Sequence, residues 1–288
     1  MTKKYGKGYL VGGGPGDPGL ITVKGMEILR RADTVVHDYL VNPGFLSYTK
    51  PGAELICVGK KAGHTVMPQE DINRLLVEKA RGGRTVARLK GGDPFIFGRG
   101  GEEAEMLAAE GIEFEIVPGV TSAAAVPAYA GIPLTHRKIA SSFAVVTGHE
   151  NPAKGESGIE WDVVARMGTV VFLMGVTNLA GNMKKLIRFG MSPDTPAAVI
   201  SRGTYPSQAS VTGTVADIAD KAAARKDIGS PAIVVTGEVV RLSDVISWYE
   251  KKPLFGKRIV VTRPREQARP LSSLFEEMGA EVVEFPAI

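Results

Sequence analysis

Short runs of β-branched residues alternate with helical stretches along this chain, and the alternation is the strongest constraint on its fold. In the first part we expect strands over residues 9–11, 34–37, 54–58, 85–89 and 113–117. Helical spacing of apolar residues covers 23–31, 70–81 and 102–109, with Thr22 as an N-cap and Gly82 and Gly111 as C′ residues. The pattern predicts an α/β layered fold with an at least partly parallel sheet.

A second set of elements follows a turn-rich stretch at 129–137. Strands are expected over 142–146, 169–173, 197–201, 207–212 and 232–236, with helices over 178–189 and 215–225. We therefore predict two α/β domains, at residues 1–133 and 134–250. The remaining residues, 251–288, predict one β-α-β unit (258–262, 268–278 and 281–285), which is too short to bury a core of its own.

Composition excludes several classes of protein. The chain has 35 glycines and 18 prolines, but no G-X-Y period and a normal 44% of hydrophobic residues, which excludes collagen and a disordered Gly/Pro-rich chain. The net charge of +4 is shared equally between residues 1–250 and 251–288. Bulk charge therefore identifies no partner, and the near-neutral body disfavours nucleic acid.

Metal and membrane sites are also disfavoured. The single cysteine, Cys57, excludes an intrachain disulfide and a cysteine-cluster zinc site, and the four histidines lack ligand spacing, so we expect no metal. No apolar run approaches the ~18 residues of a membrane span, and the N-terminus does not resemble a signal peptide. A cytoplasmic enzyme is the expected class.

A first glycine cluster, VGGGPGDPGLIT at 11–22, follows a predicted strand and precedes a predicted helix. A G-x-G-x-x-G match begins at Gly14, and Asp38 lies where a ribose-binding acid would be, so an NAD-binding Rossmann oxidoreductase is one interpretation. Pro15 and Pro18 argue against it, because they remove amide donors that should face a pyrophosphate. A tight turn without a ligand is the other simple interpretation.

A second cluster, RLKGGDPFIFGRGGEE at 88–103, follows another predicted strand. Ligands bind at this end of strands in open α/β sheets, and paired glycines let a ligand approach the backbone. Arg88, Lys90 and Arg99 concentrate positive charge, which three acids partly oppose. The acids Glu102 and Glu103 could instead simply favour a helix N-terminus.

Together with PGVTSAAAVPAYAGIPLTHR at 118–137, these two clusters resemble the uroporphyrinogen-III C-methyltransferases of the tetrapyrrole methylase superfamily. The similarity continues through VVTGH at 145–149, Met174-Gly175 and SPA at 230–232, and covers about residues 5–250. The first motif marks the superfamily, whereas GGDPFIFGRGGEE is more specific to the uroporphyrinogen enzymes. A related methylase that acts on another substrate is the nearest alternative.

The resemblance implies a two-domain tetrapyrrole methylase fold that holds S-adenosyl-L-methionine in a cleft between the domains, and a homodimer. It implies methylation of uroporphyrinogen III at C-2 and C-7, through precorrin-1 to precorrin-2, for sirohaem and cobalamin biosynthesis, with S-adenosyl-L-homocysteine as the by-product. By similarity, the cofactor-binding positions are Pro15, Gly91, Gly92, Asp93, Ile96, Thr121, Ser122, Met174, Gly203 and Ala232. Ser122 replaces the alanine common in the family, which a backbone contact would tolerate.

Substrate and catalytic residues are carried over in the same way. Porphyrinogen carboxylates suit bidentate pairing with Arg99 and Arg137, and Glu102 could orient pyrrole N–H groups or an arginine. Asp38 is a candidate base, since burial after an apolar strand would favour proton transfer, and Lys60 is a candidate proton donor. Asp38 could instead cap a turn, Lys60 could be a surface lysine, and Arg99 could assist deprotonation electrostatically. The sequence does not choose between these roles.

The last segment resembles the beginning of uroporphyrinogen-III synthase, through KRIVVTRP at 257–264 and the pair Gly279-Ala280. This resemblance implies part of a fused, multifunctional methyltransferase and synthase. A C-terminal extension that packs on the methylase is the alternative.

Overall fold

The computed structural model describes residues 5–59, 67–149 and 157–286. Contacts between residues divide the chain into two compact units, residues 1–122 and 123–288, and each is described by itself. The predicted domain limits at 133 and 250 remain predictions.

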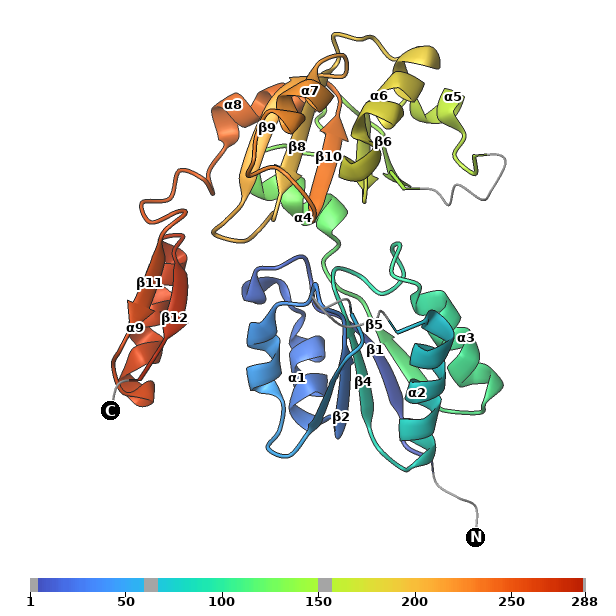
Figure 1. The fold of residues 1–288 in the computed structure, drawn as a ribbon, viewed down its shortest axis with the longest axis vertical. Coiled ribbons are helices and arrows are strands. Elements are labelled where there is room, and N and C mark those ends of the chain that lie inside the picture. The colour runs from blue at the N-terminus through green and yellow to red at the C-terminus, as the bar shows by residue number, and fades with distance from the viewer. Residues whose placement is uncertain (1–4, 60–66, 150–156, 287–288) are drawn as a thin grey trace. The chain divides into compact units, whose positions relative to one another are not determined.

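The first unit is a three-layer α/β/α structure around a five-stranded sheet of order β3-β2-β4-β1-β5 (Figure 1). All four strand pairs are parallel, as the alternating pattern predicts. Its elements are β1 (Gly8–Gly12), η1 (Pro18–Leu20), α1 (Val23–Arg31), β2 (Thr34–His37), η2 (Pro43–Tyr48), β3 (Glu54–Cys57), α2 (Gln69–Arg81), β4 (Val86–Lys90), α3 (Gly100–Ala109) and β5 (Phe114–Val117).

Alternation along the strands builds two apolar layers in this unit. Tyr9 and Leu89 face a core with α1 and η2, whereas Leu10 and Val86 face a core with α2 and α3. Because the strands are parallel, their carboxyl ends meet at one edge of the sheet, and the loops that leave this edge contain both glycine clusters.

Local sequence signals explain most helix ends. Thr22 caps α1, where its hydroxyl accepts a 3.1 Å hydrogen bond from the amide of Gly25. Gly111 has the expected left-handed φ of +67° after α3. The prediction for Gly82 was wrong in detail: Gly82 is the C-cap of α2 with a φ of −71°, and Gly83 adopts the left-handed φ of +80°.

The second unit contains a mixed five-stranded sheet of order β6-β7-β10-β8-β9. Within this sheet β6 and β7 pair in parallel, whereas β10 runs antiparallel to β7 and β8, and β8 antiparallel to β9. Its elements are α4 (Ser122–Tyr129, which begins at the boundary), β6 (Phe143–Thr147), α5 (Trp161–Val164), β7 (Thr169–Leu173), η3 (Val176–Asn178), α6 (Leu179–Arg188), β8 (Pro196–Ser201), β9 (Ala209–Thr214), α7 (Ile218–Ala223), β10 (Ala232–Thr236), η4 (Glu238–Leu242) and α8 (Ser243–Ile246).

Two apolar layers cover this sheet as well. Phe172 and Leu186 belong to the core beneath α5, α6 and α7, and Ile200 and Val239 belong to the core beneath α4 and η4. The helix α4 was not predicted, because its sequence SAAAVPAY has no apolar periodicity and contains Pro127.

The C-terminal segment has the predicted β-α-β order, with β11 (Arg258–Val261), α9 (Arg265–Glu277) and β12 (Glu281–Glu284). Its two strands pair in parallel as a separate two-stranded sheet. Val261, Ala268 and Ala280 are buried, whereas Phe285 is exposed.

Candidate functional site

Hydrogen bonds bring the two glycine clusters together at the carboxyl edge of the first sheet. The amide of Gly13 donates to the carbonyl of Lys90 at 2.8 Å. Gly14 and Gly92 exchange two backbone hydrogen bonds, of 3.2 and 2.8 Å, and form an antiparallel bridge. The loops that the sequence singled out separately are therefore one structural feature, which includes the predicted cofactor positions Pro15, Gly91 and Gly92.

Close backbone contact explains why glycine occurs in these loops. A Cβ on Gly12 would lie 2.5 Å from the Cα of Gly119, and a Cβ on Gly119 would lie 2.3 Å from the carbonyl oxygen of Gly92. No side chain fits at either contact. The loops after β1, β4 and β5 thus meet backbone to backbone, and the last of them leads to Thr121 and Ser122, at the start of α4.

Asp93 joins the same loops through its carboxylate. Its Oδ2 accepts a 3.0 Å hydrogen bond from the amide of Gly119, and its Oδ1 accepts a 2.8 Å bond from the amide of Phe95. We predicted Asp93 as a cofactor ligand. In the structure its carboxylate holds the backbone of the site in place.

Gly91 and Gly92 differ in their surroundings. Gly92 has a left-handed φ of +67°, which strains other residues. Gly91 has no such φ, and among the described residues a Cβ built there would meet a single neighbour within 4 Å, the Cβ of Leu40 at 3.8 Å. The backbone of Gly91 therefore borders a space that a bound group could fill.

Arg99 and Glu102 form a bidentate ion pair at the start of α3. Nε and Nη2 of Arg99 donate to Oε1 and Oε2 of Glu102 at 2.8 and 2.6 Å, and both side chains are about half exposed. The hydrogen bond raises the pKa of Arg99 and lowers that of Glu102. Glu102 thus contacts an arginine, which is one of the two roles considered for it, and the guanidinium of Arg99 has N–H groups beyond the two in this pair.

Asp38 is less buried than we expected. Its side chain is 32% exposed, and its Oδ1 accepts a 2.5 Å hydrogen bond from Nη2 of Arg88. Arg88 and Lys90 are themselves buried and both bind Oε1 of Glu103. Of the three cations in the second cluster, only Arg99 is thus exposed for a ligand, and Glu103 is a buried counter-ion rather than a solvent-facing helix-terminal acid.

Three predicted cofactor positions of the second unit gather at one end of its sheet. Met174 follows β7, Gly203 follows β8 and Ala232 begins β10. Because β10 runs antiparallel to β7 and β8, its first residues lie beside the last residues of these two strands.

Arg137, a predicted substrate-binding residue, is exposed in a tight turn. In this turn the amides of His136 and Ala140 each donate to the other's carbonyl at 2.9 Å.

Left-handed residues other than glycine mark these positions. The described chain has five: Phe97, Arg99, Met174, Arg202 and Thr204. Each is a predicted site residue or the neighbour of one, since Phe97 adjoins Ile96, and Arg202 and Thr204 flank Gly203. Such backbone strain is typical of functional sites, and single-residue propensities do not reveal it.

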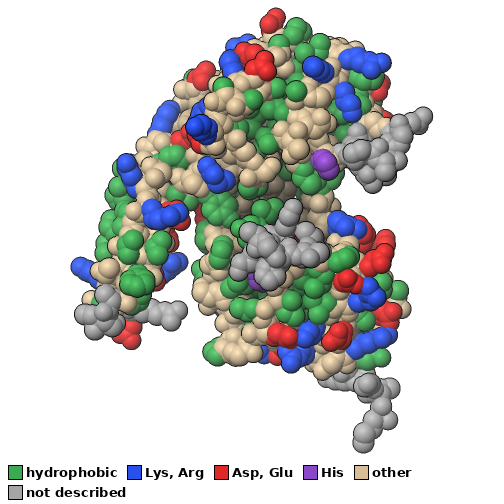
Figure 2. All heavy atoms as spheres, viewed as in Figure 1, with side chains coloured by type: hydrophobic (Ala, Val, Ile, Leu, Met, Phe, Trp, Pro, Cys, Tyr) green, Lys and Arg blue, Asp and Glu red, His purple; other side chains and the backbone are tan. Residues whose placement is uncertain are grey.

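The remaining expectations concern Lys60, metal ions, membrane-spanning helices and the charge of the surface. Lys60 lies outside the described part of the chain. Among the described residues no group of histidine, cysteine and carboxylate side chains could hold a metal ion, and no helix there is long and apolar enough to cross a membrane. Acidic and basic side chains are mixed on the face of the first unit that Figure 2 shows.

Comparison with known proteins gives relatives over most of the chain. A uroporphyrinogen-III C-methyltransferase of Bacillus subtilis is 46% identical over 287 residues, which cover 99% of this chain and 59% of the relative. The chain thus spans less than two thirds of that protein. An S-adenosyl-L-methionine-dependent uroporphyrinogen III methyltransferase of Methanosarcina barkeri is 53% identical over 247 residues, 85% of this chain and 96% of the relative.

Solved structures agree with the fold. The uroporphyrin-III C-methyltransferase of Thermus thermophilus, in complex with S-adenosyl homocysteine, superposes with a TM-score of 0.70 at 40% identity, and the match covers 82% of this chain and all of the other. The model of the family of tetrapyrrole (corrin/porphyrin) methylases matches residues 7–219. The predicted fold class is confirmed, the Rossmann oxidoreductase interpretation is wrong, and the chain belongs to the tetrapyrrole methylase family.

Proposed function

We propose that this chain is an S-adenosyl-L-methionine-dependent methyltransferase that methylates uroporphyrinogen III at C-2 and C-7 and gives precorrin-2 through precorrin-1. The observation that carries the proposal is the joining of the GGDPFIFGRGGEE loop to the first glycine cluster at one sheet edge, through Gly14 and Gly92. The names of relatives that are 46% and 53% identical support the same substrate.

The residues present fit the cofactor. A Cβ built on Gly91 would meet only Leu40 among the described residues, so the backbone there can be approached by a flat or extended group, and backbone carbonyls suit a cationic amino acid moiety. When bound, S-adenosyl-L-methionine supplies a methyl group that is already activated for transfer. Asp93 holds the loop that presents Gly91, and Ile96 adds an exposed apolar surface beside it. In the second unit, Met174, Gly203 and Ala232 are the proposed contacts.

The substrate carries carboxylates, and exposed arginines are their natural partners. We assign Arg99 and Arg137 to these carboxylates. The bidentate bond to Glu102 fixes the guanidinium of Arg99 in one orientation, so less freedom is lost when a carboxylate binds.

Methylation of a ring carbon must be followed by loss of a proton. We assign the base to Asp38, whose carboxylate is partly exposed at the end of β2 and is held through Oδ1. Among the described residues, the contacts found for this carboxylate use Oδ1, which leaves Oδ2 to accept a proton. Lys60 remains the proposed proton donor.

The proposal also covers the oligomeric state, the cellular compartment and the C-terminal segment. We infer a homodimer in the cytoplasm that supplies sirohaem and cobalamin synthesis. We also infer that residues 251–288 correspond to the start of a uroporphyrinogen-III synthase domain, because the segment folds as a β-α-β unit with parallel strands. The Bacillus subtilis match, which extends over 99% of this chain, supports continuity between the methylase and this segment.

Incubation of the protein with S-adenosyl-L-methionine and uroporphyrinogen III, under reducing and anaerobic conditions, tests the substrate. Mass spectrometry should detect a monomethylated species that is consumed and a dimethylated product that accumulates. A panel with later corrin intermediates serves as the control for the nearest alternative. Methylation of one of those and not of uroporphyrinogen III would replace the proposed substrate.

A further inference from the structure

A chain of charged side chains connects the interior of the first unit to Asp38. Nη2 of Arg88 donates to Oδ1 of Asp38 at 2.5 Å, and Nε of Arg88 donates to Oε1 of Glu103 at 2.9 Å. Nζ of Lys90 donates to the same oxygen of Glu103 at 2.9 Å. Asp38 is the one member at the surface: its side chain is 32% exposed, against 3%, 3% and 0% for Arg88, Lys90 and Glu103.

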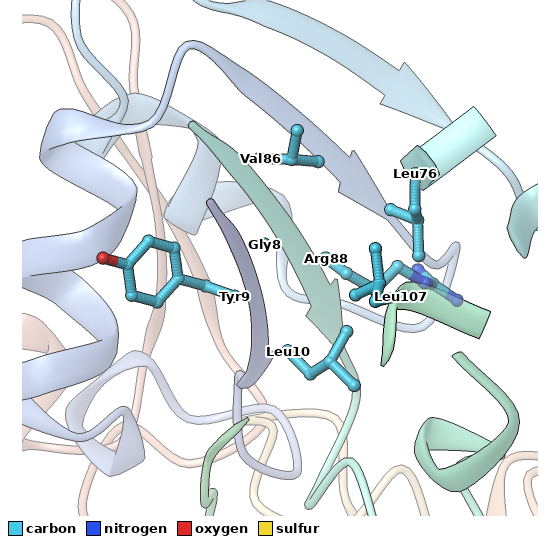
Figure 3. Close-up of a pocket in the computed structure, with 7 residues that line it drawn as sticks. All are labelled: Gly8, Tyr9, Leu10, Leu76, Val86, Arg88 and Leu107. Atoms are coloured by element: carbon cyan, nitrogen blue, oxygen red, sulfur yellow. The ribbon is translucent and has the colours of Figure 1, made fainter. Parts of the chain in front are cut away.

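The buried part of this network lies in an apolar environment. Figure 3 shows Arg88 on the same side of the strands as Leu10, Leu76 and Leu107, whereas Tyr9 points to the other side. Burial and the nearby charge of Arg88 lower the pKa of Lys90. For Arg88, burial opposes the charged form, but the carboxylates of Asp38 and Glu103 outweigh it and raise the pKa.

Stability alone explains such a network poorly. Buried ion pairs are often no better than apolar residues of similar size, because both charges lose their water. Here one oxygen of Glu103, Oε2, also has no hydrogen-bond partner among the described residues, although it is buried. A core that served packing alone would need none of these charges.

The geometry fixes Arg88 in orientation. Nη1 of its guanidinium also donates, at 3.4 Å, to the carbonyl of Val36 in the neighbouring strand β2 and to that of Leu89 in its own strand β4. The fork is therefore anchored to β2, β4 and α3, and one nitrogen is left to hold Asp38. In the described part of the chain, the contacts of the Asp38 carboxylate thus use Oδ1 and not Oδ2.

We propose that Arg88 is a positioning residue that holds the Asp38 carboxylate for proton abstraction, and that Glu103, which also binds Lys90, holds Arg88. The inference rests on the proposed function, in which Asp38 is the base. Arg88 acts through Asp38 and touches no substrate. A lysine at position 88 would keep the positive charge but lose the planar guanidinium, which binds the carboxylates of both Asp38 and Glu103.

A double-mutant cycle on methyl transfer to uroporphyrinogen III tests the inference. Its variants are Asp38→Asn, Arg88→Lys and the combination. We expect Asp38→Asn to lower kcat by about 10²–10⁴-fold, as for loss of a general base. Arg88→Lys should lower kcat by about 10-fold or more with KM little changed, because a small displacement of a base is costly. With Asn at position 38, Arg88→Lys should change kcat by less than about twofold.

Controls separate this role from a general effect on folding. Arg84→Lys is the matched control, since Arg84 precedes the same strand and makes a surface ion pair with Glu54 at 2.9 Å; its kcat should equal that of the wild type. S-adenosyl-L-homocysteine affinity should also be unchanged in each folded variant. If Arg88→Lys does not fold, Glu103→Gln replaces it in the same cycle, because the amide keeps the shape and an acceptor oxygen.

Three outcomes would overturn the inference. An equal loss of kcat from Arg88→Lys with aspartate or asparagine at position 38 would show that Arg88 does not act through Asp38. Full activity of Asp38→Asn would remove the base on which Arg88 is proposed to act. A wild-type protein that binds the cofactor but does not methylate uroporphyrinogen III would instead reject the proposed function, and with it this inference.

Discussion

Replacing Gly91 with alanine should separate cofactor binding from folding. Gly91 has no left-handed φ, and the added Cβ would make one ordinary contact with the residues that the structure describes, at 3.8 Å from the Cβ of Leu40. The fold should therefore tolerate the change, and the reduced freedom of the unfolded chain could stabilise it by about 0.4–1 kcal/mol. If the cofactor packs on this backbone, the extra methyl group would cost about 1–3 kcal/mol of binding, which corresponds to a 5- to 150-fold weaker affinity.

Calorimetric titration with S-adenosyl-L-homocysteine measures the affinity, and urea unfolding measures the stability. Gly101→Ala is the matched control. Gly101 lies in the first turn of α3, and a Cβ there meets none of the described residues within 4 Å. This variant should stabilise the fold by about 0.5–1 kcal/mol and leave the affinity unchanged. Wild-type affinity in Gly91→Ala would show that the cofactor does not approach Gly91, and the reasoning about the glycine pair would be refuted.

Further predictions concern other parts of the molecule. Gly203→Ala should destabilise the second unit by about 1–3 kcal/mol in urea unfolding, because its Cβ would lie 2.3 Å from Cγ1 of Val126, and Val126→Ala should recover part of that loss in the double variant. Arg99→Ala should raise KM for uroporphyrinogen III at least about tenfold, with unchanged S-adenosyl-L-homocysteine affinity, if it binds a carboxylate; an unchanged KM would reject that role. The hydrogen bond and charge of Lys50 lower the pKa of Asp33 in the folded protein. Asp33→Asn should therefore lower the free energy of unfolding by about 0.5–1 kcal/mol at pH values above the ordinary aspartate pKa near 4, and this difference from the wild type should vanish as the pH falls through the lowered pKa of the folded state. A difference that persists in acid would contradict this.

Local sequence signals were sufficient for the elements that position the site. The capping Thr22 and the apolar spacing after it predict α1 at its observed bounds, and β-branched runs predict β2, β7 and β10 at theirs. The two glycine clusters could be placed at the same edge because the carboxyl ends of parallel strands coincide.

Ion pairs between residues far apart in the chain could not be predicted from the sequence. No local signal shows that Glu103 lies beside Arg88, 15 residues earlier, or that Asp38, 50 residues from Arg88, completes the network. Glu102 and Glu103 are neighbours at the start of a helix, where either acid interacts favourably with the helix dipole. The sequence therefore does not show that Glu103 is buried while Glu102 is exposed.

The second unit shows the same limit. Alternating elements predict an at least partly parallel sheet, and β6 and β7 do pair in parallel, but β10 runs antiparallel to β7 and β8, and β8 antiparallel to β9. The composition of a strand does not indicate its direction. The left-handed backbone at Met174, Arg202 and Thr204 could not be predicted either, because these residue types do not favour it.

The most direct test of the central claim is the position of the transferred methyl groups. Incubation with S-adenosyl-L-methionine labelled with ¹³C in the methyl group, followed by NMR of the tetrapyrrole product, should show labelled methyl signals at C-2 and C-7 and two equivalents of S-adenosyl-L-homocysteine per product. Label at another ring carbon, a single stable methylation, or no label in the tetrapyrrole while the cofactor still binds would contradict the account.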